Sequence, residues 1–184
     1  MVFDEHRKKA EELAERAQSS LREGKTAEAL AAYTELLSLF EKSNDPEAQA
    51  RVLNNRGLML TRMNRYDEAM KNFQAALGIF KRLGRSLHIA EQWGNIGSVH
   101  RDMNEHEQAL KSYNRALPLY EKLGHSEGMA DQYTNIAYIH AVGNRPEEAL
   151  DWYRKALPLY EQAGAERKAE ITRQNIGNLA RSSG

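Results

Sequence analysis

Cysteine is absent from the 184-residue chain. Its absence excludes a disulfide framework, a thiolate metal site and a cysteine nucleophile together. Long apolar runs are also missing, because no window approaches the roughly 18 apolar residues that a membrane-spanning helix needs. Residues 1–7 lack the apolar core of a signal peptide. We therefore expect a cytoplasmic protein with no membrane partner.

Neither sign of charge is in excess: Lys+Arg and Asp+Glu number 26 each, so the formal net charge is zero. A nucleic-acid-binding protein normally carries a basic excess or a basic stripe, so no nucleic-acid partner is expected. The HExxH, GxSxG and glycine-rich phosphate-binding motifs are missing as well. His100 and His140 share a position in the pattern described below, and we interpret them as structural. We expect no enzyme activity, no catalytic residue, no metal and no cofactor.

What the chain does contain is an internal repeat. Shifting the chain against itself by 40 residues aligns four segments without a gap. Their second halves read TAEALAAYTELLSLF from Thr26, YDEAMKNFQAALGIF from Tyr66, HEQALKSYNRALPLY from His106 and PEEALDWYRKALPLY from Pro146. A fixed period of this length is the signature of a solenoid. We predict one domain over residues 1–184, with repeats at about 5–44, 45–84, 85–124 and 125–164, and a half repeat or capping helix at 165–184.

Apolar residues within each repeat recur at helical rather than alternating spacing. In the third repeat, one face of the second helix carries Ala109, Tyr113, Ala116, Leu117, Tyr120 and Leu123. Residues that tolerate a left-handed backbone punctuate the pattern where helices should end: Asn64, Asn104 and Asn144 within repeats, and Gly84, Gly124 and Gly164 between repeats. The pattern predicts nine helices, as four antiparallel pairs and a final helix.

Small and aromatic residues fall in register from repeat to repeat. One position of the first helices holds a small residue in successive repeats: Gly57, Gly97, Ala137 and Gly177. Three positions of the second helices are equally regular: Ala29, Ala69, Ala109 and Ala149; Tyr33, Phe73, Tyr113 and Tyr153; and Ala76, Ala116 and Ala156. This pattern resembles the tetratricopeptide repeat family over nearly the whole chain. The 40-residue period is similar to the longer-helix subgroup of spindle-orientation adaptors and kinesin light chains. The resemblance implies an all-α, right-handed solenoid whose concave groove binds polypeptide.

Asparagine recurs at one further position of the first helices, as Asn55, Asn95, Asn135 and Asn175, and we call these four residues the asparagine column. Asparagine inside a helix costs several tenths of a kcal/mol relative to alanine, so four copies at one register indicate a compensating role. Its side chain offers a donor and an acceptor, which can pair with the backbone of an extended peptide whatever the peptide's sequence. In the resembled family this flank lines the groove. The alternative is that these amides tie neighbouring helices together, and both roles can coexist.

Residues flanking the asparagines should supply specificity. The predicted peptide-binding set is Asn54, Asn55, Arg62, Glu91, Asn95, Ser98, Arg101, Asp102, Asp131, Asn135, Tyr138, Asn175 and Asn178, with Leu58, Thr134, Gln174 and Arg181 beside them. The charges in this set are mixed, so it selects neither an acidic nor a basic ligand.

The predicted function is a non-catalytic interaction module or adaptor, which binds an extended peptide or a disordered segment of a partner protein. Three alternatives remain. The chain could be a self-assembling scaffold, a fragment of a larger signalling protein, or an enzyme or small-molecule sensor with a deep closed pocket. Size-exclusion mass over a concentration series separates self-association from binding of another protein.

The final half repeat yields a first testable prediction. Solenoids need a polar outer face at their ends, and residues 165–184 can provide one over the fourth repeat. Deleting 165–184 should expose the apolar face of that repeat, lower the melting temperature and reduce solubility. Thermal denaturation of the full and shortened chains measures the effect, and an unchanged melting temperature would contradict a capping role.

Overall fold

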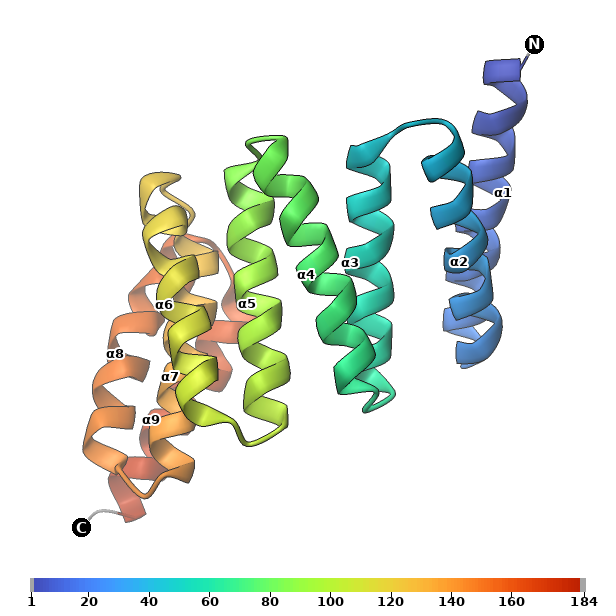
Figure 1. Cartoon of the computed structure of the whole chain (residues 1–184). Coiled ribbons are helices and arrows are strands. Elements are labelled where there is room, and N and C mark those ends of the chain that lie inside the picture. The colour runs from blue at the N-terminus through green and yellow to red at the C-terminus, as the bar shows by residue number, and fades with distance from the viewer. Residues whose placement is uncertain (1, 183–184) are drawn as a thin grey trace. The chain divides into compact units, whose positions relative to one another are not determined.

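The computed structural model describes the backbone of residues 2–182 and the side chains of residues 6–181. Across residues 2–182 the chain forms nine α-helices and no strand, as predicted (Figure 1). They are α1 (Val2–Arg22), α2 (Thr26–Lys42), α3 (Pro46–Arg62), α4 (Tyr66–Arg82), α5 (Ser86–Asp102), α6 (His106–Lys122), α7 (Ser126–Val142), α8 (Pro146–Gln162) and α9 (Glu166–Ser182). Residues 183–184 of the predicted final half repeat lie outside the described residues.

The predicted turn residues end the helices. Asn64, Asn104 and Asn144 have φ between 55° and 61°, and Gly84, Gly124 and Gly164 have φ between 62° and 68°. In the first repeat, Gly24 (φ 73°) and Asn44 (φ 53°), which were not among the predicted turn residues, end α1 and α2 in the same way. After α5, the Asn104 amide donates to the Arg101 carbonyl at 2.9 Å and the Glu105 amide donates to the His100 carbonyl at 2.8 Å. This pair of bonds is the Schellman pattern, which satisfies carbonyls that the helix end leaves without intrahelical partners.

Contacts between helices divide the chain into two units, residues 1–85 and 86–184. In the first unit α1 packs on α2, α2 on α3 and α3 on α4. Its largest described core cluster draws on three helices: Leu13, Ala17, Ala29, Ala32, Tyr33, Leu36, Val52 and Met59. Asp45 caps α3 by accepting a hydrogen bond from the Ala48 amide at 2.9 Å, and Pro46 occupies the first turn, where its missing N–H costs no hydrogen bond.

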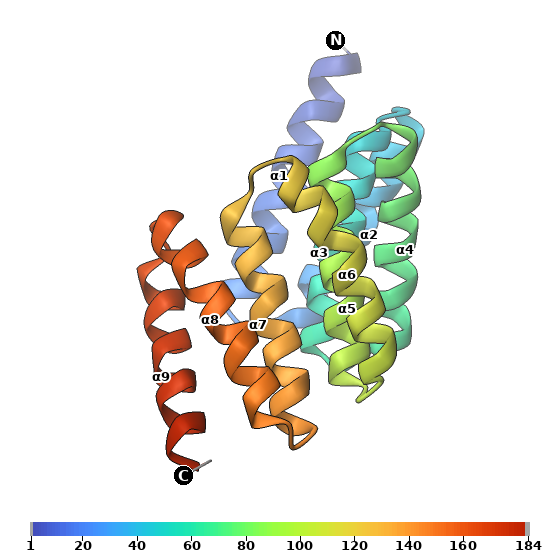
Figure 2. The ribbon, with the colours of Figure 1, turned by 90° about the vertical axis from the view of Figure 1, so that its left-hand side faces the viewer.

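In the second unit α5 packs on α6, α6 on α7, α7 on α8 and α8 on α9 (Figures 1 and 2). Direct contacts also join α5 to α7, the first helices of two successive repeats. Among its described residues, apolar side chains form these clusters: Ala90, Ala116 and Tyr120; Ala109, Tyr113, Ile136 and Ile139; Ala130, Ala156, Tyr160 and Ala169. The predicted all-α fold of paired helical repeats with a further C-terminal helix is confirmed.

Aromatic rings of the second helices rest directly on glycines of the first helices. A Cβ atom at Gly97 would lie 2.5 Å from the Tyr113 ring, and one at Gly57 would lie 2.5 Å from the Phe73 ring. Real Cβ atoms do not approach other atoms so closely, so only glycine permits these contacts. The Tyr113 and Phe73 side chains are 0% and 1% exposed, which leaves each ring little room to move.

Helix α9 differs from the earlier first helices. It buries Ala169 and Thr172, which are 0% and 2% exposed. Continued from the earlier first helices, the repeat pattern predicts that Ile176, Gly177 and Ala180 face inward. That expectation is wrong for Gly177, which has no neighbour within 4 Å of an added Cβ, and for Ala180, which is exposed. No described helix follows α9, so no second-helix ring covers this face.

The glycine contacts predict opposite effects of one substitution at two equivalent positions. Gly97→Ala should displace the Tyr113 ring, at a cost of about 1–3 kcal/mol that exceeds the gain of up to about 1 kcal/mol in helix propensity. Gly177→Ala adds the same methyl group where no neighbour obstructs it, so stability should stay level or rise. Thermal denaturation should therefore show a melting temperature lowered by a few degrees for Gly97→Ala only. Equal melting temperatures for the two variants would contradict the ring contact.

Candidate functional site

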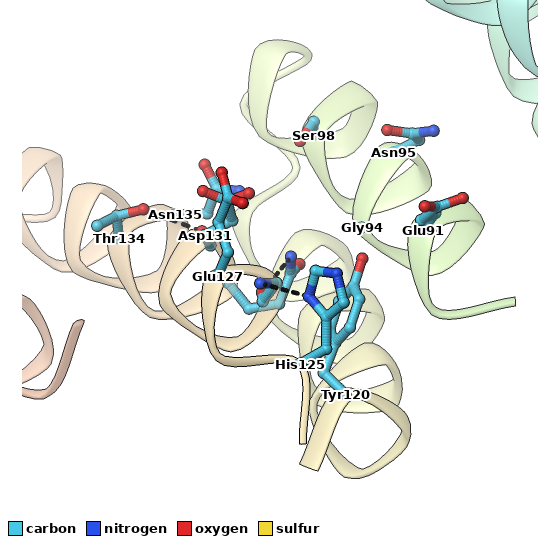
Figure 3. Close-up of a pocket in the computed structure, with 12 residues that line it drawn as sticks. Glu91, Gly94, Asn95, Ser98, Tyr120, His125, Glu127, Asp131, Thr134 and Asn135 are labelled. Atoms are coloured by element: carbon cyan, nitrogen blue, oxygen red, sulfur yellow. Dashed lines mark hydrogen bonds between the residues drawn. The ribbon is translucent and has the colours of Figure 1, made fainter. Parts of the chain in front are cut away.

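A polar cavity of about 440 Å³ opens between α5 and α7 of the second unit (Figure 3). We call it the α5–α7 cavity. Its walls are formed by Glu91, Gly94, Asn95, Ser98, Tyr120, His125, Glu127, Gly128, Asp131, Gln132, Thr134 and Asn135. The predicted peptide-binding residues Glu91, Asn95, Ser98, Asp131 and Asn135 thus line a common cavity.

Helical spacing brings these side chains to one surface. On α5, Glu91 lies one turn before Asn95, and on α7, Asp131 lies one turn before Asn135. Residues four apart lie one above the other on the same face of a helix. Since α5 and α7 are the first helices of successive repeats and contact each other directly, the two faces meet at the cavity.

The beginning of α7 forms one end of the α5–α7 cavity. His125 caps the helix by accepting a hydrogen bond at Nδ1 from the Gly128 amide, with a length of 3.0 Å. The Tyr120 ring from α6 lies 5.4 Å from the His125 ring, centroid to centroid. A Cβ at Gly128 would come within 2.5 Å of the Tyr120 ring, so glycine is required here for α6 to approach α7. Burial, then the nearby Glu91 and Asp131 charges, raise the pKa of Tyr120, so its hydroxyl stays neutral.

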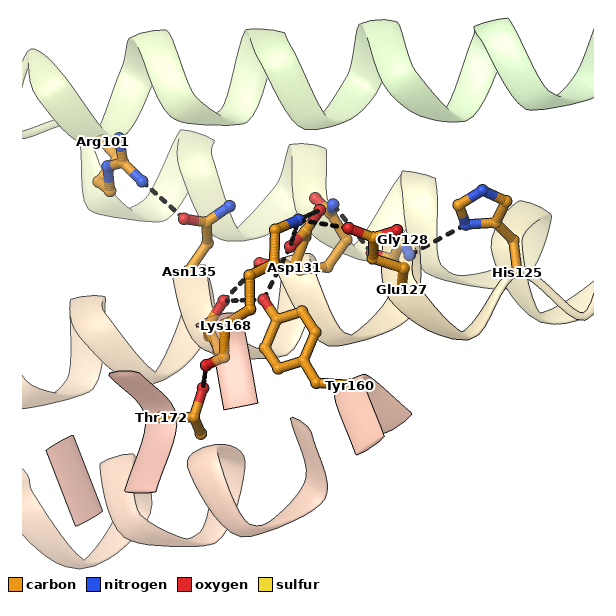
Figure 4. Close-up of polar contacts among 11 residues, drawn as sticks. Arg101, His125, Glu127, Gly128, Asp131, Asn135, Tyr160, Lys168 and Thr172 are labelled. Atoms are coloured by element: carbon orange, nitrogen blue, oxygen red, sulfur yellow. Dashed lines mark hydrogen bonds and ion pairs between the residues drawn. The ribbon is translucent and has the colours of Figure 1, made fainter. Parts of the chain in front are cut away.

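Lys168 of α9 joins the acidic groups of α7 (Figure 4). Its Nζ lies 2.7 and 2.9 Å from the two carboxylate oxygens of Asp131 and 2.9 Å from Oε1 of Glu127. The Tyr160 hydroxyl donates to Asp131 Oδ1 at 2.7 Å. Hydrogen bonding to Lys168 lowers the pKa of Glu127. Burial opposes the charge on Lys168, but hydrogen bonds to Asp131 and Glu127 outweigh burial and raise the pKa of Lys168.

A second cavity, of about 240 Å³, continues along α7 toward α9. We call it the α7–α9 cavity. It is lined by Arg101, Asp131, Thr134, Asn135, Tyr138, Tyr153, Tyr160, Lys168, Ile171, Thr172 and Asn175. Asp131, Thr134 and Asn135 line both cavities, so the two adjoin along α7. The α7–α9 cavity is the more apolar of the two, because tyrosine rings and Ile171 form much of its wall.

The asparagine column has partners within the unit. Asn135 Oδ1 accepts a hydrogen bond of 2.6 Å from Arg101 Nη1, which ties α7 to α5. Arg101 also pairs with Asp102 at 2.8 Å and lies over the Tyr138 ring, 5.7 Å from its centroid. A hydrogen bond from Asn175 opposes the rise that burial causes in the pKa of Tyr153. Helix tying, the alternative role predicted for this column, is therefore present at Asn135.

Some predicted residues lie away from these cavities. Asp102 and Asn178 line neither of them, and Asn178 Oδ1 accepts a hydrogen bond from its neighbour Arg181 at 2.7 Å. Asn54, Asn55 and Arg62 belong to α3 of the first unit, where Asn54 Nδ2 donates to Asn55 Oδ1 at 3.3 Å.

Sequence reasoning missed several residues that shape the cavities: Tyr120, His125, Glu127, Gln132, Tyr153, Tyr160 and Lys168. One signal was present. The last aromatic of each second helix is Phe40, Phe80, Tyr120 or Tyr160. A hydroxyl is thus present only in the two repeats whose rings line these cavities.

The histidines and carboxylates of residues 6–181 contain no group of three or more that could hold a metal ion. His100 Nδ1 lies 2.6 Å from Glu105 Oε2, and burial lowers the pKa of His140. Within residues 2–182 none of the helices combines the length and apolarity that crossing a membrane requires.

No curated protein matches the sequence. The solved structure of BtubC (BKLC) from P. vanneervenii superposes with a TM-score of 0.72 at 19% identity, covering 94% of this chain and 80% of that one. The apo form of RapI superposes with a TM-score of 0.80 at 16% identity, covering 91% of this chain. This chain spans about half the length of RapI, since the match covers 47% of it.

The family model for the tetratricopeptide repeat matches residues 9–82 and 86–184, which together are most of the chain. The two structural similarities concern the fold alone. The chain belongs to the tetratricopeptide repeat family.

Proposed function

We propose that the second unit is a non-catalytic binding module that holds an extended segment of a partner protein along α5, α7 and α9. The observation that carries this proposal is the placement of Asn95 and Asn135 on the two helices that border one cavity, with Asn175 on the adjoining cavity (Figure 3). A row of amides along a polar surface suits a peptide backbone, which offers a donor and an acceptor at every residue.

Arg101 defines how Asn135 would contribute. Its guanidinium donates a hydrogen bond to Asn135 Oδ1, while no described residue of the second unit accepts a hydrogen bond from Asn135 Nδ2. Asn135 is therefore oriented to donate to a carbonyl of the bound segment. Holding the amide in place before binding reduces the entropy lost when the segment is ordered.

The shape of the cavities favours a chain over a small molecule. The two cavities are open and adjoin along α7, and the larger α5–α7 cavity is lined mainly by polar groups, whereas a small-molecule site is typically a concave, mostly apolar pocket. Equivalent helices of successive repeats lie roughly 8–10 Å apart, which is about three residues of extended chain at about 3.3 Å each. One backbone could thus meet Asn95, Asn135 and Asn175 in turn.

The double variant Asn95→Ala and Asn135→Ala tests this proposal. The ligand should be a synthetic peptide obtained by selecting a displayed library of disordered segments on the wild-type chain. Losing a hydrogen bond that leaves a buried partner unpaired costs about 1–3 kcal/mol. Affinity measured by fluorescence polarisation should fall by roughly one to three orders of magnitude.

The matched control is Asn114→Ala, which removes the same side chain from an exposed position on α6 that lines neither cavity. It should leave affinity unchanged. The double variant should keep its stability within about 1 kcal/mol, because the better helix propensity of alanine offsets the lost Arg101 bond. A double variant that melts several degrees lower yet binds normally would show that the asparagines are structural only.

A further inference from the structure

The α5–α7 cavity is dominated by oxygen atoms that accept hydrogen bonds. Glu91 contributes a carboxylate from α5, and Glu127 and Asp131 contribute two from α7 (Figure 3). The only described ion-pair partner of the two α7 carboxylates is Lys168, which adds a single positive charge. No ion pair to Glu91 is formed among residues 86–181. The cavity therefore has a net negative charge.

A buried amide provides a second, independent observation. The Gln132 side chain is 4% exposed and lines the same cavity. Its Nε2 donates to the Gly128 carbonyl at 3.2 Å, but its buried Oε1 accepts no hydrogen bond from the described residues. A buried acceptor without a donor is costly, so native proteins nearly always supply one. The missing partner of Gln132 is a hydrogen-bond donor.

Lys168 shows what kind of donor this part of the unit attracts. Its ammonium makes three contacts, two to Asp131 and one to Glu127, and lies 5.6 Å from the centre of the Tyr160 ring (Figure 4). An ammonium has three N–H groups, so these contacts use all of them. Lys168 comes from α9 and lines the α7–α9 cavity, not the α5–α7 cavity. The Glu91 carboxylate and the Gln132 oxygen are therefore available to bind a second cation.

We infer that the α5–α7 cavity binds the guanidinium group of an arginine side chain carried by the bound segment. A guanidinium presents five N–H donors in one plane, which suits acceptors contributed by two different helices. It can face the carboxylates of Glu91 and Asp131 and the Gln132 oxygen at the same time. An ammonium is a compact point charge and does not match acceptors spread over two helices in this way. This inference rests on the proposed function, because the arginine belongs to the segment whose backbone lies along Asn95 and Asn135.

The experiment uses the full chain and three blocked single residues as probes: N-acetyl-arginine N-methylamide, its lysine analogue and its citrulline analogue. Citrulline has nearly the shape of arginine without the charge. Titrations followed by ¹H–¹⁵N NMR should show saturable shifts of the Gly94 amide and the Gln132 side-chain amide with the arginine probe. The citrulline probe should bind at least about tenfold more weakly, as expected when a charge-assisted hydrogen bond is lost. Equal binding of the citrulline or lysine probe would overturn the assignment.

The variant that isolates the site is Glu91→Gln, which keeps the side-chain size and removes a carboxylate without a described ion pair. Affinity for the arginine probe should fall about tenfold. Glu107→Gln, at an exposed position on α6 outside the cavity, should leave that affinity unchanged. Unaltered binding to Glu91→Gln would overturn the inference.

The two proposals can fail separately. If selected peptides depend on Asn95 and Asn135 but bind Glu91→Gln as well as the wild-type chain, the arginine site is wrong and the groove function stands. If binding of the arginine probe depends on Glu91 while selected peptides bind the asparagine variants normally, the arginine site is supported and the proposed backbone contacts of Asn95 and Asn135 are wrong.

Discussion

Contact between an aromatic ring of one helix and a glycine of its partner holds the second and third repeats together. The Tyr113 ring lies where a side chain at position 97 would have to be, and Phe73 does the same over Gly57. Because each ring is almost completely buried, it sets both the separation and the axial register of the two helices. That register also fixes where the first helix directs its other flank, the one that does not face the second helix.

The two cavities are consequences of this packing. Once α5 and α7 present their small residues to the second helices, Glu91, Asn95, Asp131 and Asn135 occur on the remaining flank. The residues that complete the site come from elsewhere: Tyr120 from the end of α6, Tyr160 from the end of α8 and Lys168 from α9. The Lys168 pairs then neutralise part of the acidic surface and join α9 to α7.

Much of the fold could be predicted because the information repeats. Within residues 2–182, the nine helices, the asparagine and glycine turns and the closely packed small and aromatic residues recur every 40 residues, so each copy provides evidence of the same local structure. Predictions failed where a residue lacks the neighbour that its counterparts have. Gly177 continues the glycine column, yet no ring covers it, because α9 is followed by no described second helix.

The sequence by itself determined the helices, their ends, their pairing and the family, since these depend on contacts between residues near one another in a 40-residue period. It also identified the flank that carries Asn95 and Asn135. Only the tertiary structure decided which atoms on that flank are already used. Arg101 and Asn135 are 34 residues apart, and Lys168 and Asp131 are 37 apart, so no local pattern links them. Their pairing depends on side-chain reach between packed helices, and that reach leaves Glu91 and Gln132 facing the α5–α7 cavity without such partners.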